Sequence, residues 1–543
     1  MMNKEIRWLK PNGNMNQVLL SSIISFCRLA SANGYKAFTT KKTNLIFALT
    51  LFFSLSLIPL NAQFNKNEYV EIISANSLES TTPGIQELIG DVKLKQGSMY
   101  LSCDKAVINE KTNDFTATGH VYMNKKDSVR TYSNVMEYLG LTKQTIFSGN
   151  VKLVSDKTTL ETDKLTYENN GDAHYENSAN ITQENTKIFS KRGTYHTSKH
   201  MISFRENVVV KAEEFYITSN ALDYDTKTKI TYFIGPTNII SKNGKIYCEA
   251  GYFDNNKGES VFKKNAVVRD KAMILKADSI YRNTKKEVSH AYRNVHATDT
   301  VDNVTITGEH GIFYEKAGKS IITENALLQQ MIDGDTLFLH ADTLRAVNDE
   351  KKKEKKIYAY HGVRFLKDDL KGICDSLTYF PSDSLIKLFK DPVLWMDKSQ
   401  ISGQYIEILI YGNKIHELRI KKNGFIISQN GKNAFDQIKG RDMTGYFSDG
   451  KMKKMKVMGN GETVYFAKEK DSSYTGVNKA ECSNLMIHFK DNQVSKIKFY
   501  QKPDALFIPI DQIDLEKLKL KDFMWRIEEK PKDVADLLKK KAH

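Results

Sequence analysis

Apolar and polar residues repeat along this chain with a period of roughly 29 residues, from about Asn76 to about Tyr500. Each repeat places one short polar residue, named the anchor here, inside an apolar frame, as in residues 160–167 (LETDKLTY) and 217–224 (ITSNALDY). Such self-similarity is typical of an array in which each unit buries its apolar face by stacking on its neighbours. The sequence therefore predicts one elongated repeat array. The anchors are Asn76, Asp104, Asn134, Asp163, Lys191, Asn220, Glu249, Asp278, Glu309, Asp342, Asp375 and Gln404, with weaker copies at Asp442 and Ser483.

The apolar alternation changes its parity at each anchor. Around Asp163, apolar or small residues lie three and one positions before the anchor and two and four positions after it. A strand with such a change would turn its apolar face outward unless the backbone bulges or bends. We therefore expect every rung to bend at its anchor, so that the stacked strands form a folded sheet with two inner walls.

The second half of each unit is predicted to be another strand, introduced by a turn rich in Asn, Gly, Lys and Thr. Residues 110–113, 169–171, 225–227 and 255–258 are such turns. Gly or Asn before a small or β-branched residue, as in Gly119-His-Val121, is expected to head the strand. Because these are hairpin turns, consecutive strands should be antiparallel. The predicted fold is all-β, an elongated antiparallel jelly roll or solenoid of stacked bent strands with a short helix in the C-terminal tail.

Four segments are expected along the chain. Residues 1–62 form an N-terminal extension with a secretory signal peptide at 41–62, where Lys41 and Lys42 precede an apolar run and Ala62 marks the cleavage point. That run is shorter than the ~20 residues of a membrane-spanning helix, although an uncleaved anchor is the alternative. The regular array covers 63–410, variant β repeats 411–510, and a tail 511–543 with a helix at 534–538. The tail either docks near the terminal rungs or binds a partner.

The net charge is +15, and residues 1–62 carry seven Lys or Arg and one Glu, so the remainder carries +9. A basic excess suits an anionic partner such as a phosphorylated lipid headgroup, although a Lys-rich solvated surface explains it equally well. Export argues against nucleic acid as the partner. Export through a signal peptide predicts a periplasmic protein, possibly associated with the outer membrane.

Four of the five cysteines occupy the same place in their repeats, immediately before the anchor: Cys103, Cys248, Cys374 and Cys482. Cys103 and Cys248 are five repeats apart, or roughly 24 Å at one strand spacing per repeat, beyond the ~7 Å limit for bridging. We expect no disulfide in the mature chain. The cysteines should act as small buried hydrophobic residues.

Candidate chemistry is sparse. The histidines are scattered, and the nearest pair in the array, His290 and His296, lacks neighbouring carboxylates. The sequence has no Gly-rich phosphate loop, nucleophile elbow or paired-cysteine metal motif. We therefore expect a protein that is not an enzyme and that has no catalytic residues, no cofactor and no metal site.

Units of the form Ser/Ala-Asp-x-Leu-x-Tyr followed by Gly-Asn-Val, behind a signal peptide, resemble the OstA-like family. That family includes the LptA-type periplasmic lipopolysaccharide transport proteins and the N-terminal domain of the LptD-type translocon. The likeness is closest at residues 149–151, 160–167 and 217–224 and extends over about 70–410. Compared with LptA-type proteins, this chain has more repeats and an additional C-terminal region. It also lacks the membrane-barrel sequence and the paired cysteines of the full translocon.

The resemblance implies a jelly-roll bridge that shelters the acyl chains of lipopolysaccharide or a similar glycolipid. Other transport proteins of both membranes would be its partners, and exposed terminal strands would permit end-to-end self-association. The alternative is a structural or adhesin-like β-solenoid with a filled interior; a carbohydrate-binding solenoid would instead show aromatic platforms and clustered carboxylates outside. The candidate lipid-trough residues are Leu160, Leu165, Tyr167, Ile217, Leu222, Tyr224, Ile246, Phe253, Leu275, Ile280, Phe313, Leu339 and Leu344.

Overall fold

The computed structural model describes residues 70–539, apart from 126–128, 156–157, 214, 243, 255, 270–272, 301–302, 316, 333–334, 350–353, 412–413, 432, 449, 469–472 and 491–492. The predicted signal peptide at 41–62 lies outside the described residues. The chain divides into two compact units. Among the described residues, the N-terminal unit comprises 70–269 and 276–289, and the C-terminal unit comprises 273–275 and 290–539.

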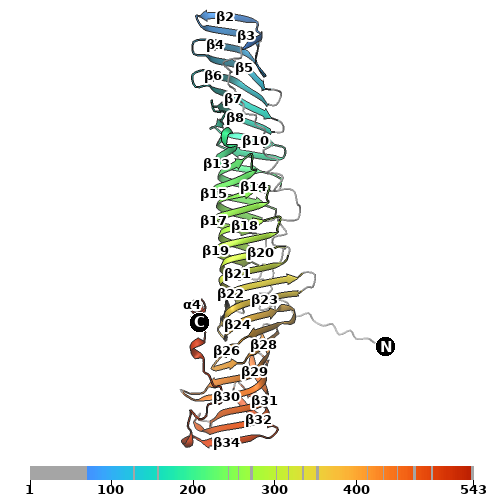
Figure 1. Cartoon of the computed structure of the whole chain (residues 1–543), viewed down its shortest axis with the longest axis vertical. Coiled ribbons are helices and arrows are strands. Elements are labelled where there is room, and N and C mark those ends of the chain that lie inside the picture. The colour runs from blue at the N-terminus through green and yellow to red at the C-terminus, as the bar shows by residue number, and fades with distance from the viewer. Residues whose placement is uncertain are drawn as a thin grey trace, which may run out of the picture. The chain divides into compact units, whose positions relative to one another are not determined.

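The N-terminal unit is built from antiparallel strands, each hydrogen-bonded to the next rung (Figure 1). Some rungs consist of two short strands in place of one long strand. The strands are β1 (Glu71–Ser74), β2 (Ser77–Thr82), β3 (Ile85–Gln96), β4 (Met99–Asn109), β5 (Asp114–Lys125), β6 (Val129–Leu139), β7 (Gln144–Ser155), β8 (Thr158–Tyr167), β9 (Ala173–Tyr175), β10 (Ala179–Gln183), β11 (Thr186–Ser190), β12 (Arg192–His196), β13 (Met201–Lys211), β14 (Phe215–Asp225), β15 (Ile230–Ser241), β16 (Gly244–Asp254) and β17 (Glu259–Arg269), with the 3-10 turn η2 (Thr197–Lys199). β18 (Met273–Asn283) contributes residues to both units, and so does the strand that begins at Val288.

The C-terminal unit repeats this antiparallel arrangement with longer strands. Its strands are β19 (Val288–Asp299), β20 (Val304–Tyr314), β21 (Lys319–Ile332), β22 (Asp335–Asp349), β23 (Glu354–Lys367), β24 (Leu370–Phe380), β25 (Leu385–Phe389), β26 (Val393–Met396), β27 (Ser399–Ser402), β28 (Tyr405–Tyr411), β29 (Lys414–Gln429), β30 (Phe435–Ser448), β31 (Lys451–Lys468), β32 (Tyr474–Lys490), β33 (Gln493–Tyr500) and β34 (Asp504–Pro509). Short helices are η3 (Pro381–Asp383), η4 (Ile510–Gln512), η5 (Ile527–Glu529) and α4 (Val534–Leu537). The predicted all-β antiparallel fold with a short helix in the tail is confirmed.

Each rung bends because one anchor residue lies opposite two residues of the neighbouring strand. In the β14–β15 pair, Ser219 faces Thr237 and Ala221 faces Ile234, which leaves Asn220 opposite residues 235–236. The register shifts in the same way at the anchor of β4, β6, β16, β22 and β24. The predicted bulge at the anchor is therefore confirmed.

The bulge itself uses left-handed backbone. Gly119 and His120 have φ of 77° and 43°, and Glu324 and Asn325 have φ of 64° and 61°. Gly and Asn adopt this region at least cost. At several rungs the anchor N–H donates to the carbonyl of the first bulge residue, as from Lys191 to Glu206 at 3.0 Å. This bond gives the anchor backbone a partner where the regular ladder is interrupted.

Two details of the sequence interpretation are wrong. The Gly or Asn dipeptides do not head their strands: Gly119 lies in the middle of β5, since the strand has already begun at Asp114 after the 110–113 turn. The weak anchor assigned to Asp442 belongs to Arg441, because Asp442 pairs with Met458 in regular register and the bulge of Gly459 and Asn460 lies beside Arg441.

The bend divides every rung into two segments. The leading wall consists of the strand segments that precede the anchors, together with the segments of neighbouring strands that follow the bulges and pair with them. The trailing wall consists of the strand segments that follow the anchors, together with the segments of neighbouring strands that precede the bulges. Side chains alternate between an inner face, which is buried, and an outer face, which is mostly exposed or half-buried, as along β14. The core of each unit lies on the inner faces of both walls.

The C-terminal tail covers the outer face of the leading wall within the C-terminal unit. Leu518 and Leu520 pack on outward-facing Phe425, Ile427 and Val464. Figure 1 shows this segment running beside the strands of the unit as far as α4. Polar side chains of the wall hold its backbone: Gln437 Nε2 donates to Leu518 O at 3.2 Å, Gln400 Nε2 donates to Met524 O at 2.8 Å, and Arg364 Nη1 donates to Asp536 O at 2.9 Å.

Candidate functional site

Most of the predicted trough residues lie on the buried inner faces. Leu165, Tyr167, Ile217, Leu222, Tyr224, Ile246, Phe253, Leu275, Ile280, Phe313 and Leu344 are all less than 9% exposed. Leu160 and Leu339 are half-buried. The change of parity at the anchor therefore brings residues from both sides of it to one continuous apolar interior in each unit.

Cross-strand register joins several of these residues into rows. Ile217 faces Ile239, which faces Ile246 on the next strand of the leading wall. On the trailing wall, Tyr224 and Phe253 both face Thr231 from opposite sides. Directly opposed side chains of this kind stabilise a sheet by about 0.2–1 kcal/mol per pair. The residues selected from the sequence therefore lie in cross-strand rows of the inner face and are not isolated positions.

The trailing wall carries most of the inner aromatic side chains of the N-terminal unit. The ring of Phe147 meets that of Tyr167 edge to face, with 6.1 Å between centroids, and Phe233 stacks on Phe262 at 6.2 Å. Burial raises the pKa of the Tyr167 and Tyr224 hydroxyls, with nearby Asp225 adding to the effect at Tyr224. These tyrosines are therefore neutral at any physiological pH, which suits an apolar surface.

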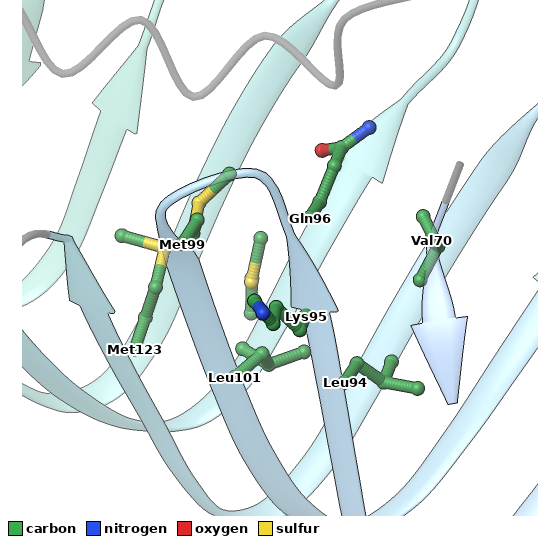
Figure 2. A pocket seen from close by; sticks show the side chains of 8 residues that line it. Val70, Leu94, Lys95, Gln96, Met99, Leu101 and Met123 are labelled. Carbon is green, nitrogen blue, oxygen red and sulfur yellow. The ribbon is translucent and has the colours of Figure 1, made fainter. Parts of the chain in front are cut away.

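An apolar hollow opens on the inner face at the first rungs of the N-terminal unit (Figure 2). It has a volume of about 20 Å³ and is lined by Val70, Leu94, Lys95, Gln96, Met99, Leu101, Met123 and Met136. Figure 2 shows the thioether side chains of Met99 and Met123 above Leu101 and Leu94. Methionine side chains adapt to irregular apolar partners because they are unbranched and polarisable. These methionines therefore make this part of the inner face adaptable to a flexible apolar ligand.

Sequence reasoning missed these methionines. It selected candidates from the most regular repeats and stopped short of the first rungs, where Met replaces Leu, Ile or Phe. The signal was present, because Met99 and Leu101 stand five and three positions before the anchor Asp104, in the same frame as Leu160 before Asp163.

The anchors occupy the outer side of the bend, where they stabilise the corner. The carboxylate of Asp375 accepts from Ser376 Oγ at 2.6 Å and lies near the side chains of His361 and Lys390. The hydrogen bond from Ser376, together with these two neighbours, holds the pKa of the Asp375 carboxyl below its usual range. These anchors are structural residues of the corner.

Catalytic and metal-binding arrangements are scarce in the part of the chain that the structure covers. Among the described residues, no group of three or more His, Cys, Asp or Glu side chains is placed to hold a metal ion. The four described cysteines are buried, and desolvation raises the pKa of the thiols of Cys103 to about 11 and of Cys248 to about 12, so these thiols are poor nucleophiles. His290 stacks on His310 with 5.6 Å between ring centroids, not on His296. Within the described ranges, no helix has the length and hydropathy to span a bilayer.

Comparison with known proteins supports the resemblance stated above. Residues 67–220 match the family model of OstA-like proteins, and residues 305–413 match that of the LptA and LptD N-terminal domain lipopolysaccharide transport proteins. A search of curated proteins gave no match.

Two solved structures are similar to parts of the chain. LptH, the LptA-homologous periplasmic component of the lipopolysaccharide transport device from Pseudomonas aeruginosa, is 21% identical; the match covers 19% of this chain and 77% of LptH, with a TM-score of 0.18. The WD40 domain of SCAP from fission yeast is 8% identical over 73% of this chain and 95% of that domain, with a TM-score of 0.11. TM-scores this low do not establish a common fold.

Proposed function

Since residues 67–220 and 305–413 make this chain a member of the OstA-like lipopolysaccharide transport family, we propose that it carries lipopolysaccharide or a similar glycolipid across the periplasm. The acyl chains would lie between the inner faces of the leading and trailing walls. The thirteen trough residues named from the sequence, together with the methionines of the hollow, would form the lipid-contacting surface.

The need for such a surface follows from the cost of exposing acyl chains to water. Each methylene left in water costs about 0.8 kcal/mol, so a chain of ordinary length cannot cross an aqueous compartment unshielded. A continuous apolar surface made of many similar rungs offers the chain nearly equal sites along its path. Movement from one rung to the next would then require no chemistry in this chain and no cofactor.

The observation that carries the proposal is the Met-lined hollow at β3 to β6. It lies on the inner face, it is apolar, and it is built from the same frame positions as the fully packed rungs. We propose that this hollow is an entry or exit point for an acyl chain and that the walls separate further along as the lipid advances.

The family also guides the proposals on location and partners. We propose that the chain works in the periplasm, handing its lipid to or from transport proteins of the inner and outer membranes. End-to-end association through terminal strands would extend the path, because an unpaired edge strand can add a strand from a second molecule. Its role would be binding and transfer, without catalysis.

The second candidate is a structural β-solenoid that binds no ligand. The observation in its favour is the complete burial of many inner side chains: Leu275, Ile306 and Ile322 are 0% exposed. An interior filled in this way would give stiffness and would admit no lipid unless the walls moved apart. The two functions therefore differ in whether the inner face ever contacts lipid.

Photocrosslinking separates the two candidates. A photoreactive amino acid replaces Leu222, whose side chain is 4% exposed on the inner face, and in a control variant it replaces Tyr232, an outer-face residue of the next strand on the same wall. Transport predicts lipopolysaccharide adducts at Leu222 and none at Tyr232. Absence of adducts at Leu222 in a folded protein incubated with lipopolysaccharide would favour the filled solenoid.

A further inference from the structure

The outer face of the leading wall in the N-terminal unit carries a continuous row of cross-strand neighbours from β3 to β17. One row begins with Lys95 opposite Tyr100 and passes Arg130 on β6. It continues through Lys187 on β11 and Lys211 on β13 to Lys245 and Arg269 on β16 and β17. A parallel row, two residues nearer the anchors, contains Lys93, Lys152 and Glu161.

These rows are strongly basic. Glu161 is the one carboxylate among their described members, and Lys152 already pairs with it at 3.0 Å. The cations further along make no ion pair with any described residue of the chain; they are Arg130, Lys187, Lys211, Lys245 and Arg269. All five are exposed. The trailing wall of the same unit differs, since its outer face mixes cations with Glu87, Glu137, Asp223 and other acids.

Two pairs of cations stand directly opposite each other on adjacent strands. Lys187 faces Lys211, and Lys245 faces Arg269. Like charges directly opposite on a sheet are destabilising. The repulsion within each pair therefore lowers the stability of the folded chain. An anion bound between the two side chains would turn this repulsion into a net attraction.

A hollow of about 720 Å³ lies at the second pair. Its described lining has the cations Lys242, Lys245 and Arg269 and the neutral hydrogen-bonding side chains Thr218, Asn238 and Tyr247, and no carboxylate. The apolar side chains of Ile239, Ile240, Ile246 and Val267 line the rest. Glu249 stands at the margin, where it accepts from Tyr247 Oη at 3.2 Å and from Asn265 Nδ2 at 3.0 Å. The hollow thus combines unneutralised positive charge with uncharged donors and acceptors.

We propose that this hollow on β14 to β17 binds a saccharide that carries phosphate groups. Lys245 and Arg269 would hold a phosphate between them, since a guanidinium and an ammonium both form charge-assisted hydrogen bonds to phosphate oxygens. Asn238, Thr218 and Tyr247 would meet the sugar hydroxyls. The ligand is of the same class as the saccharide part of the proposed cargo, so this proposal rests on the proposed function, although the site lies on the outer face and does not depend on lipid entering the interior.

The shape of the surface argues for a saccharide over an anionic bilayer. Neighbouring strands in a sheet are rotated by roughly 20–25°, so a row crossing β3 to β17 turns away from any single plane. A flat bilayer could meet only a short part of it and could not enter a hollow. A flexible chain of sugars can follow a turning surface and enter the hollow.

The test measures binding by isothermal titration calorimetry with the full chain. The probe is the phosphorylated oligosaccharide released from lipopolysaccharide by complete deacylation, and comparison probes are its dephosphorylated form, inorganic phosphate, and phosphatidylcholine vesicles containing phosphatidylglycerol. The test variant is Lys245→Glu/Arg269→Glu. The matched control is Lys263→Glu/Lys264→Glu, which makes the same charge change on the trailing-wall side of β17.

We expect the phosphorylated oligosaccharide to bind the wild-type chain and to bind the test variant at least about tenfold more weakly, a change of about 1.4 kcal/mol. The control variant should bind as the wild type does. A milder variant, Lys245→Gln/Arg269→Gln, guards against misfolding, and its melting temperature should equal or exceed that of the wild type because the like-charge opposition is gone.

Three results would overturn the proposal. Equal loss in the test and control variants would mean that only net charge matters. Equal binding of inorganic phosphate and the oligosaccharide would mean that the site recognises phosphate and not a saccharide. Binding to the anionic vesicles with none to the oligosaccharide would assign the surface to a bilayer. Crosslinking at Leu222 reports on the interior alone, so failure of transport and failure of this site are distinguishable.

Discussion

The contact between each anchor and the bulge opposite it can be tested at Gly119, where the first bulge residue of β5 lies under the side chain of Asp104. A Cβ atom added at Gly119 would stand 2.7 Å from the Asp104 Cβ, closer than real Cβ atoms approach, and the glycine has φ of 77°. Gly119→Ala therefore meets both a backbone and a steric penalty. Gly235 provides a matched site, with φ of 83° and no atom nearer than 3.7 Å.

The expected magnitudes follow from these geometries. Gly235→Ala should cost about 1–2 kcal/mol, the penalty of a left-handed conformation for an L-residue. Gly119→Ala should cost about 1–3 kcal/mol more, in the range of an overpacked site, because Asp104 must also move. Asp104→Gly removes the whole obstruction, its Cβ included, so the double variant Asp104→Gly/Gly119→Ala should be less destabilised than the sum of its single variants.

The assay is hydrogen exchange of the β4 and β5 amides, which reports local opening even if the whole chain does not unfold in two states. Urea unfolding provides a second readout. If Gly119→Ala and Gly235→Ala lose the same protection, or if the double variant is fully additive, the anchor does not pack on the bulge and the account of the corner fails.

Three further predictions concern other parts of the molecule. Because burial raises the pKa of the Cys248 and Cys374 thiols to about 12, iodoacetamide at pH 8 should label them only after unfolding, and a reductant should leave the melting temperature unchanged; rapid labelling of the native protein would contradict this. Leu520→Ala should weaken tail docking by about 2–5 kcal/mol, the cost of truncating a buried leucine, seen as faster proteolysis within 510–539; unchanged proteolysis would mean that the tail is held by its polar contacts alone. Burial lowers the pKa of His340 from its ordinary value of 6.5, outweighing the hydrogen bond to Ala326 O and the field of Asp342. The folded state therefore disfavours the imidazolium, and its contribution to stability is complete above pH 6.5 and declines as the pH falls below that value. The melting temperature should fall less between pH 7 and 5 in His340→Gln than in the wild type, and an equal fall in both would contradict this.

The bend of each rung could be predicted because the sequence records it directly. A straight strand cannot explain why the alternation of apolar and polar residues shifts by one position at Asp163 and Asn220. The shift also identified the inner residues on both sides of the corner. The location of the left-handed residues could not be obtained in the same way. Gly119 and Asn207 have the composition of turns, and the same residue types serve turns and bulges because both need positive φ.

The docking of the tail was left open between the terminal rungs and a partner, although a signal was present. In the N-terminal unit polar or charged residues such as Thr218 and Lys211 interrupt the apolar ones at the outer positions of the leading wall. The corresponding stretches of the C-terminal unit, Val393–Met396 and residues 425–427, are apolar at successive positions, which is typical of strands buried on both faces. The cover for the second face is the segment with Leu518 and Leu520.

The central claim is that lipid contacts the face defined by the parity change at the anchor. A photoreactive residue stepped along β4 tests it most directly, in the Lys245→Glu/Arg269→Glu background so that the outer site is removed. The account predicts lipopolysaccharide adducts at Leu101 and at Ala106, which lie on the inner face on either side of Asp104, and none at Ser102 or Lys105. Adducts at Leu101 and Lys105 but not at Ala106, as a straight strand would give, would contradict it. So would the absence of adducts from both Leu101 and Ala106.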